Sequence, residues 1–221
     1  MIYDEYQFEK VNPNSMDLLW KGGFRHFGSY FFRYSVGLLN GEYAQVIPLR
    51  ILLNSFHFSK SQKRTIKKNQ DLKVIIRDSF IDEEKEKLFT IHAERFTENK
   101  PESIYNFLSP ENTATCPCEL KEICVYENER LAAVSFLDLG EKASSSVYAM
   151  FHPDYSKRRL GIYTMLLEIE YSKNRNMDYL YPGYAYREKS FYDYKKRFHP
   201  MEYFDWNGNW LPFYEEETNE D

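Results

Sequence analysis

The pattern of hydrophobic and polar positions along the chain predicts strands in both halves of the sequence. Short apolar or alternating runs of the kind found in strands are followed by turn signals or by polar residues. They occupy residues 44–53, 71–77, 119–126, 131–139, 145–151 and 177–181. Asn207-Gly208 marks a late hairpin turn. The chain is therefore expected to contain a sizeable sheet.

Helical patterns separate these predicted strands. Residues 82–96 and 154–174 have helical patterns, and a shorter helix is expected at 103–108. Ser59, followed three residues later by Gln62, is a capping-box pattern that predicts a further helix ending near residue 69. Residues 12–42, which contain repeated Gly, Asn and Pro, are expected to form loops.

The order of the predicted elements favours one fold class. Three antiparallel strands (119–151), a helix (154–174) and a strand beside the turn before that helix indicate an α/β (α+β) protein with a GNAT-like acyltransferase fold. In such a domain the helix starts at the splayed centre of the sheet, where donor and acceptor meet. We expect residues 1–78 to form a smaller N-terminal lobe. Residues 79–221 should form the GNAT-like domain and an acidic C-terminal tail.

Composition is that of a globular protein, with 43% hydrophobic and 29% charged residues in 221. The net charge is −5, but the charges are unevenly distributed. Basic residues cluster at 60–68, 157–159 and 195–197, and acidic residues at 82–86 and 215–221. Such basic clusters can hold a polyanion locally, although each can equally be a solvated helix face.

Nothing at the start of the sequence resembles a signal peptide, and no apolar run approaches the roughly 20 residues of a membrane span. We expect a cytoplasmic protein with no membrane partner. The three cysteines, Cys116, Cys118 and Cys124, favour reduced thiols over a metal site because no fourth ligand is near in sequence. We therefore expect no metal and no cofactor.

Six blocks of sequence in the same order carry a family pattern. They lie at residues 23–33, 58–72, 136–148, 153–161, 181–184 and 194–202. They resemble the arginyl- and leucyl-tRNA–protein transferases, in which the corresponding motifs include G-[WF]-R-R-x-G, F-x-x-S-Q-R-R, S-S-V-Y, P-x-Y-x-x-R-S-L-G, Y-L-G-Y and Y-K-x-R-F-x-P-x-E. The resemblance covers nearly the whole chain. It implies transfer of Leu or Arg from charged tRNA to the α-amine of proteins that begin with Asp or Glu, which marks them for degradation.

The sequence also departs from this family. Residues 34–49 contain no cysteine, whereas the family has an N-terminal cysteine cluster there, so no iron–sulfur, haem or zinc role is carried over. Tyr34, His152, Arg159 and Pro182 replace the usual Pro, Asp, Ser and Leu. The cysteine-poor sequence is more similar to the bacterial members, which slightly favours Leu.

The resemblance suggests roles for particular residues. Asp138 is the candidate for orienting and deprotonating the attacking amine, and Tyr148 for contacting the ester or acceptor backbone; the alternatives are an exposed turn Asp and an ordinary strand Tyr. Arg25, Arg33 and Tyr184 are candidates for binding the acceptor, because an arginine fork suits a carboxylate. Either arginine could instead be a surface charge.

The expected partners are an aminoacyl-tRNA and a protein with an acidic N-terminus, bound by a monomer. Phosphate contacts are assigned to Lys60, Lys63, Arg64, Lys67, Lys68, Lys157, Arg158, Lys195 and Arg197.

Two other functions remain open. A coenzyme A-dependent GNAT N-acyltransferase would need R/Q-x-x-G-x-G/A, but Tyr163 occupies the last position, where a small residue is required. The other is a non-catalytic tRNA-binding regulator derived from a transferase.

Overall fold

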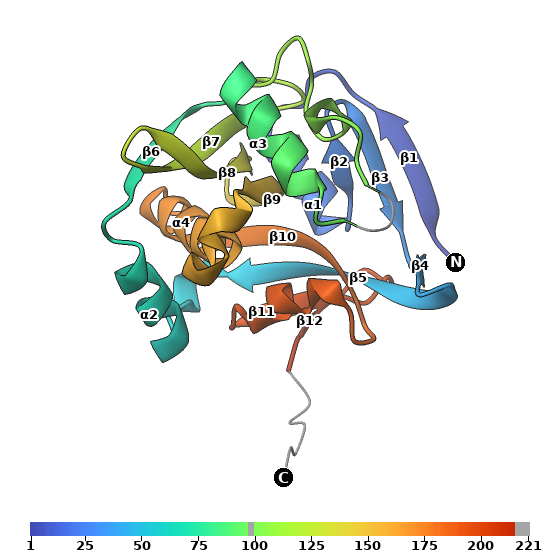
Figure 1. The fold of residues 1–221 in the computed structure, drawn as a ribbon. Coiled ribbons are helices and arrows are strands. Elements are labelled where there is room, and N and C mark those ends of the chain that lie inside the picture. The colour runs from blue at the N-terminus through green and yellow to red at the C-terminus, as the bar shows by residue number, and fades with distance from the viewer. Residues whose placement is uncertain (97–99, 215–221) are drawn as a thin grey trace.

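The computed structural model describes residues 1–96 and 100–214, and its secondary structure is shown in Figure 1. Within these residues the helices are α1 (Pro13–Lys21), α2 (Lys60–Lys68), α3 (Glu83–Ala93) and α4 (Leu160–Asn174). The strands are β1 (Tyr3–Gln7), β2 (Arg25–Phe27), β3 (Tyr30–Tyr34), β4 (Val36–Leu39), β5 (Glu42–Leu52), β6 (Lys73–Asp78), β7 (Glu119–Glu127), β8 (Arg130–Leu139), β9 (Ala143–Phe151), β10 (Tyr179–Tyr186), β11 (Met201–Phe204) and β12 (Trp210–Pro212). The predicted mixed α/β class is confirmed.

A nine-stranded sheet forms the centre of the molecule. Its order is β12-β11-β5-β10-β9-β8-β7-β6, and β4 pairs with β5. All neighbours are antiparallel except β9 and β10, which are parallel. Three antiparallel strands, a helix and a strand parallel to the third follow one another in the chain, as expected for a GNAT-like domain. A separate sheet, β1-β3-β2, lies beside the large one.

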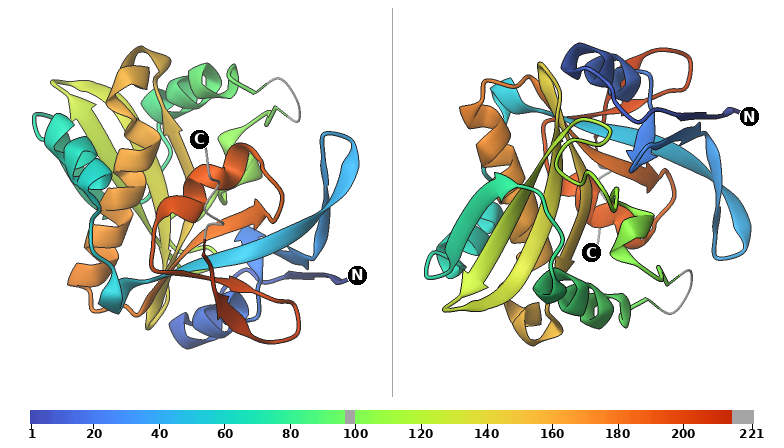
Figure 2. Two further views of the ribbon diagram at one scale, coloured as in Figure 1. Left: turned by 90° about the horizontal axis from the view of Figure 1, so that it is seen from below. Right: turned by 90° about the horizontal axis from the view of Figure 1, so that it is seen from above.

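Helices α3 and α4 cover opposite faces of strands β7–β9 (Figure 2). Strand alternation explains this division, because neighbouring residues point to opposite sides. Cys124 and Val134 pack with α3, whereas the adjacent Val125 and Ala133 pack with the start of α4. Glu168 is a buried polar residue on α4.

The expectation that residues 12–42 form loops is wrong. Asn12 caps α1 by accepting a hydrogen bond from the backbone of Ser15 at 2.9 Å, and Pro13 occupies the first turn. The same Asn-Pro pair that signals a turn therefore starts a helix. Strands β2, β3 and β4 also lie in this segment, and Met16, Trp20 and Phe31 give it a buried core.

Two predicted helices differ in detail. The segment 154–174 is interrupted at Arg159, whose φ of 58° separates a 3-10 helix (Pro153–Arg158) from α4. The segment 103–108 contains only a 3-10 turn, Ile104–Asn106. The capping box at Ser59 is confirmed, with both of its hydrogen bonds to Gln62 present.

The division at residue 78 stays a prediction. Strands β5 and β6, which precede it, pair with β10 and β7, which follow it. The acidic tail, 215–221, lies outside the described residues. None of the described helices is long and apolar enough to cross a membrane.

Candidate active site

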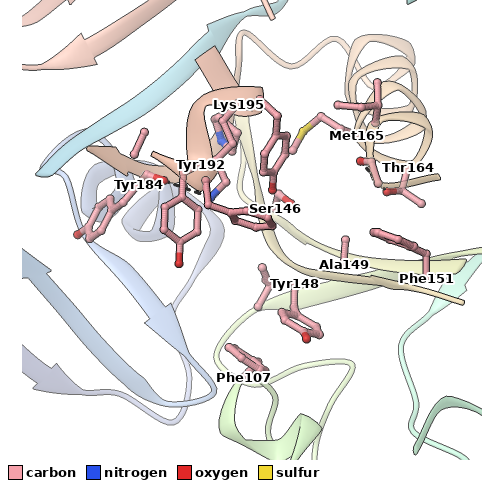
Figure 3. Close-up of a pocket in the computed structure, with 18 of the residues that line it drawn as sticks. Phe107, Ser146, Tyr148, Ala149, Phe151, Thr164, Met165, Tyr184, Tyr192 and Lys195 are labelled. Atoms are coloured by element: carbon pink, nitrogen blue, oxygen red, sulfur yellow. Dashed lines mark hydrogen bonds between the residues drawn. The ribbon is translucent and has the colours of Figure 1, made fainter. Parts of the chain in front are cut away.

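A cavity of about 940 Å³ opens where β9 and β10 separate. The two strands pair only over three residues each, ending at Ser145 and Tyr181. Beyond this point both strands contribute to the cavity wall, as do the start of α4 and the small sheet. Figure 3 shows Ser146, Tyr148, Tyr184 and Lys195 at this cavity.

Two cations meet above Gly183 in the cavity wall. A Cβ atom at Gly183 would lie 3.0 Å from Lys195 Nζ and 3.4 Å from Arg25 Cζ. The φ of Gly183 is +100°, a backbone conformation that favours glycine. Glycine is also needed here because any side chain would crowd the two cations. Burial, and then the charge of Arg25, lowers the pKa of Lys195 to about 7. The arrangement is suited to binding an anion.

Arg25 is held on β9 by two short hydrogen bonds. Its Nη1 donates to Ser145 Oγ and its Nη2 to the carbonyl oxygen of Ser146, both at 2.5 Å. Lys195 Nζ donates to the carbonyl oxygen of Tyr184 at 3.2 Å. The two cations are thus fixed to the two strands that separate.

Glu168 is the single acidic side chain among the described residues that line the cavity. It is 1% exposed; Oε1 accepts a hydrogen bond from Ser146 Oγ at 3.4 Å, and Oε2 has no partner among the described residues. Burial raises the pKa of Glu168 to about 8, although the Ser135 and Ser146 hydroxyls, and then the charges of Arg25 and Lys195, act in the opposite direction. The sequence analysis missed Glu168. Its position within the apolar run 165–169 is a signal that could have identified it.

Aromatic and aliphatic side chains form much of the rest of the wall, which also includes the cations Arg95 and Arg159. Tyr148 stacks on Phe107 with ring centroids 4.1 Å apart and an interplanar angle of 12°. The Tyr148 hydroxyl is buried and has no partner in the described structure. Ile162, Met165 and Ala185 add aliphatic surface. The cavity therefore combines a small charged site with a large apolar one.

Comparisons with known proteins agree with this geometry. The family described as "Arginine-tRNA-protein transferase, C terminus" matches residues 61–205. An aspartate/glutamate leucyltransferase from Campylobacter jejuni is 31% identical over 203 residues, which are 90% of this chain and 83% of that protein. A second, from Saccharophagus degradans, is 29% identical over 92% of this chain and 85% of that protein. The chain belongs to the aminoacyl-tRNA–protein transferase family. This transferase is thus an enzyme of the aminoacyl-tRNA-dependent class.

Solved structures support the fold of the transferase. The C-terminal DUF2156 domain of an Agrobacterium fabrum protein matches with a TM-score of 0.51 and 10% identity. The match covers 63% of this chain and 46% of that one. At this identity the likeness concerns the fold alone.

Asp138 of the transferase is not among the described residues that line the cavity. It is 1% exposed, with Oδ2 lying 2.8 Å from His26 Nε2 and Oδ1 accepting from Cys118 Sγ at 3.5 Å. Each of these three side chains offers one atom that could bind a metal ion, and the three atoms lie within 4.8 Å of one another. Because His26 directly follows Arg25 on β2, the buried pair helps to hold that strand against β8. The catalytic role of Asp138 stays a prediction.

The acceptor-binding candidates lie in different places. Arg25 lines the cavity, whereas Arg33 forms an ion pair with Asp4 at 2.6 Å and is not among the described lining residues. Tyr184 lines the cavity, but its hydroxyl donates to the carbonyl oxygen of Gly23 at 2.7 Å. Tyr184 thereby ties β10 to the segment that carries Arg25. Tyr148, the other catalytic candidate, lines the cavity.

The basic residues also separate into groups. All five cations of α2 are exposed, as are Lys157 and Arg197, whereas Lys195 lines the cavity. Arg158 is bound to Asp71 at 2.9 Å and to Glu127 at 3.0 Å. Arg159, which the sequence analysis did not assign to tRNA, lines the cavity and donates to Ser61 Oγ of α2 at 3.4 Å. Arg159 therefore connects α2, which carries the five exposed cations, to the cavity.

Proposed function

We propose that this transferase moves leucine from leucyl-tRNA to the α-amine of proteins that begin with Asp or Glu. The observation that carries this proposal is the convergence of Arg25 and Lys195 above Gly183 inside the cavity. A fixed guanidinium beside an ammonium group suits a carboxylate, and charge-assisted hydrogen bonds are strong where water is excluded. The acidic side chain of the acceptor would bind there.

The apolar wall supports leucine as the transferred residue. Ile162, Met165 and Ala185 provide aliphatic surface for a leucyl side chain. An arginyl side chain would need a carboxylate, and Glu168 already faces the two cations as the single acidic lining residue in the described structure. The names of the two relatives, both aspartate/glutamate leucyltransferases, support the same choice.

The path from α2 to the cavity supports binding of a charged tRNA. Exposed cations on α2 would contact phosphates, and Arg159 would lie near the 3′ end. An aminoacyl ester is already activated, so the enzyme must mainly position the amine and accept a proton.

We further propose that the transferase acts as a monomer in the cytoplasm and that its products are marked for degradation.

The direct test incubates the protein with leucyl-tRNA or arginyl-tRNA and with peptides that begin with Asp, Glu, Asn or Gln. The expected result by mass spectrometry is the addition of one leucine to the Asp and Glu peptides only. Arg25→Ala should reduce transfer strongly, whereas the matched exposed substitution Arg197→Ala should affect only tRNA affinity. Transfer of arginine, or equal transfer to Asn and Gln peptides, would contradict the proposal.

The alternative functions predict different results. A coenzyme A-dependent acyltransferase should bind acetyl-coenzyme A in calorimetry, although Arg158 at the corresponding loop is occupied by Asp71 and Glu127. A non-catalytic regulator should bind tRNA and transfer nothing to any peptide. Neither result is expected.

A further inference from the structure

We propose that Ser146 and Glu168 form the proton-transfer pair that activates the acceptor amine, an inference that rests on the proposed function. The first observation is the incomplete hydrogen bonding of Glu168. Its Oε2 makes no hydrogen bond of good geometry in the described structure, although the Ser135 hydroxyl is close enough to lower the pKa of Glu168, and the side chain is 1% exposed. A buried carboxylate with an unused oxygen is costly to the fold, which is typical of a group kept for function.

The second observation is that Ser146 lies between Arg25 and Glu168 and contacts both. Its carbonyl oxygen accepts from Arg25 at 2.5 Å, and its hydroxyl donates to Glu168 Oε1 at 3.4 Å. An N-terminal Asp has only two carbons between its side-chain carboxylate and its α-amine. If the carboxylate binds Arg25 and Lys195, the amine therefore lies within reach of the Ser146 hydroxyl.

The hydrogen bond from Ser146 Oγ to Glu168 Oε1 is long, at 3.4 Å, and catalytic hydrogen bonds often shorten when substrate binds. Ser146 lines the cavity on β9, and Glu168 approaches the same wall from α4. The hydroxyl is thus the group that touches the amine, and the carboxylate acts through it.

The proton transfer balances as follows. The α-ammonium gives one proton to Ser146 Oγ while Ser146 gives its own to Glu168, which leaves a neutral amine. The nitrogen attacks the ester carbonyl, the C–N bond forms and the bond from the carbonyl carbon to the ribose oxygen breaks. A second proton moves from the nitrogen to the departing ribose oxygen. Glu168 then releases its proton to solvent.

The acidities of the two groups support this transfer. The pKa of Glu168 is about 8, and an α-amine has a pKa of about 7.7–8.0. A proton transfer between groups of nearly equal pKa has little free-energy cost in either direction.

The test compares Glu168→Gln, Ser146→Ala and Ser146→Thr with the wild type, using leucyl-tRNA and an Asp-starting peptide. Glu168→Gln and Ser146→Ala should lower kcat by about 100-fold or more, with much smaller changes in the KM for the peptide. Ser146→Thr keeps the hydroxyl and should restore most of the rate. The wild-type rate should rise with pH through about 8, and Glu168→Gln should keep only the part of this rise that comes from deprotonation of the peptide's α-amine.

A second acceptor separates proton transfer from structural damage. In a peptide that begins with 3-fluoroaspartate, the fluorine makes the α-amine less basic, so more of it is already neutral. The loss of rate in Glu168→Gln should be clearly smaller with this peptide. An equal loss with both peptides, or a wild-type kcat in Glu168→Gln, would overturn the inference.

Folding is monitored by the melting temperature of the same variant. The pKa of Glu168 is raised from 4.5 to about 8, so its ionisation destabilises the folded state increasingly as the pH rises through this interval. Glu168→Gln should therefore melt at or above the wild-type temperature at pH values above about 8. Absence of transfer by the wild type would instead overturn the proposed function, and this inference with it.

Discussion

At the scale of single residues, the charged part of the cavity depends on Lys195 keeping its proton. Burial and the nearby guanidinium of Arg25 lower its pKa to about 7, so the ammonium form is present below this pH and is lost above it. An acceptor carboxylate that binds between the two side chains therefore loses one of its cations as the solution becomes more alkaline.

We expect the KM of the wild type for an Asp-starting peptide to increase as the pH rises through about 7. Lys195→Arg should have a much flatter profile because a guanidinium keeps its charge throughout this range. The α-amine of the peptide titrates identically with both enzymes, so the difference between the two curves reports Lys195. Parallel curves would show that this charge does not bind the acceptor.

Individual residues also show how far the sequence could predict the site. Arg25, Tyr148 and Tyr184 were identified from motifs, and all three line the cavity. Lys195 was assigned to phosphate because it stands in a run of three basic residues, yet it lines the cavity, whereas Arg197 is exposed. Neighbours in a sequence can face different environments, and charge alone does not reveal which of them is buried.

At the scale of elements, the separation of β9 and β10 creates the site, and Gly183 lies where the two cations approach β10. Gly183→Ala would place a methyl group 3.0 Å from Lys195 Nζ and 3.4 Å from Arg25 Cζ. We expect this variant to raise the KM for acidic peptides by about tenfold or more, since a loss of about 1.4 kcal/mol of binding is a tenfold change.

Gly41→Ala is the matched control. Gly41 also has a positive φ, +82°, but no atom lies within 4 Å of its added Cβ. Both substitutions strain the backbone by about 1 kcal/mol, and only Gly183→Ala displaces the cations. Thermal melting of both variants reports the backbone strain that they share. The KM for acidic peptides reports the displacement of Lys195 and Arg25, which only Gly183→Ala should cause. Equal kinetics in the two variants would count against the anion site.

Elements with strong local signals were predictable, whereas those formed by tertiary contacts were not. Helix α2 has a capping box, and β8 is a long apolar run, so both were recognised. Strands β2 and β3 are short and follow glycines, and they are stabilised by pairing with each other and with β1. Nothing in their local pattern reveals those partners.

At the scale of the whole molecule, a net charge of −5 opposes binding of a polyanion, so tRNA affinity must depend on where the cations gather. Exposed basic residues cover α2, and Arg159 links that helix to the cavity. The six sequence blocks predicted the family, and the order of the predicted strands and helices predicted the α/β class. Residues of five of these blocks, all except 58–72, line one cavity, and that meeting could be seen only in the three-dimensional fold.

This distribution of charge predicts a particular response to salt. The KM for leucyl-tRNA should rise with salt concentration, and Lys63→Gln with Lys67→Gln should make the logarithmic slope shallower by roughly 0.7–0.9 for each phosphate contact removed. Lys87→Gln is the control, because Lys87 is 68% exposed but lies on α3. The KM for the peptide should change little in all variants. If the α2 variants and Lys87→Gln have the same slope, tRNA does not bind along α2, because only cations that displace counterions from its phosphates alter the salt dependence.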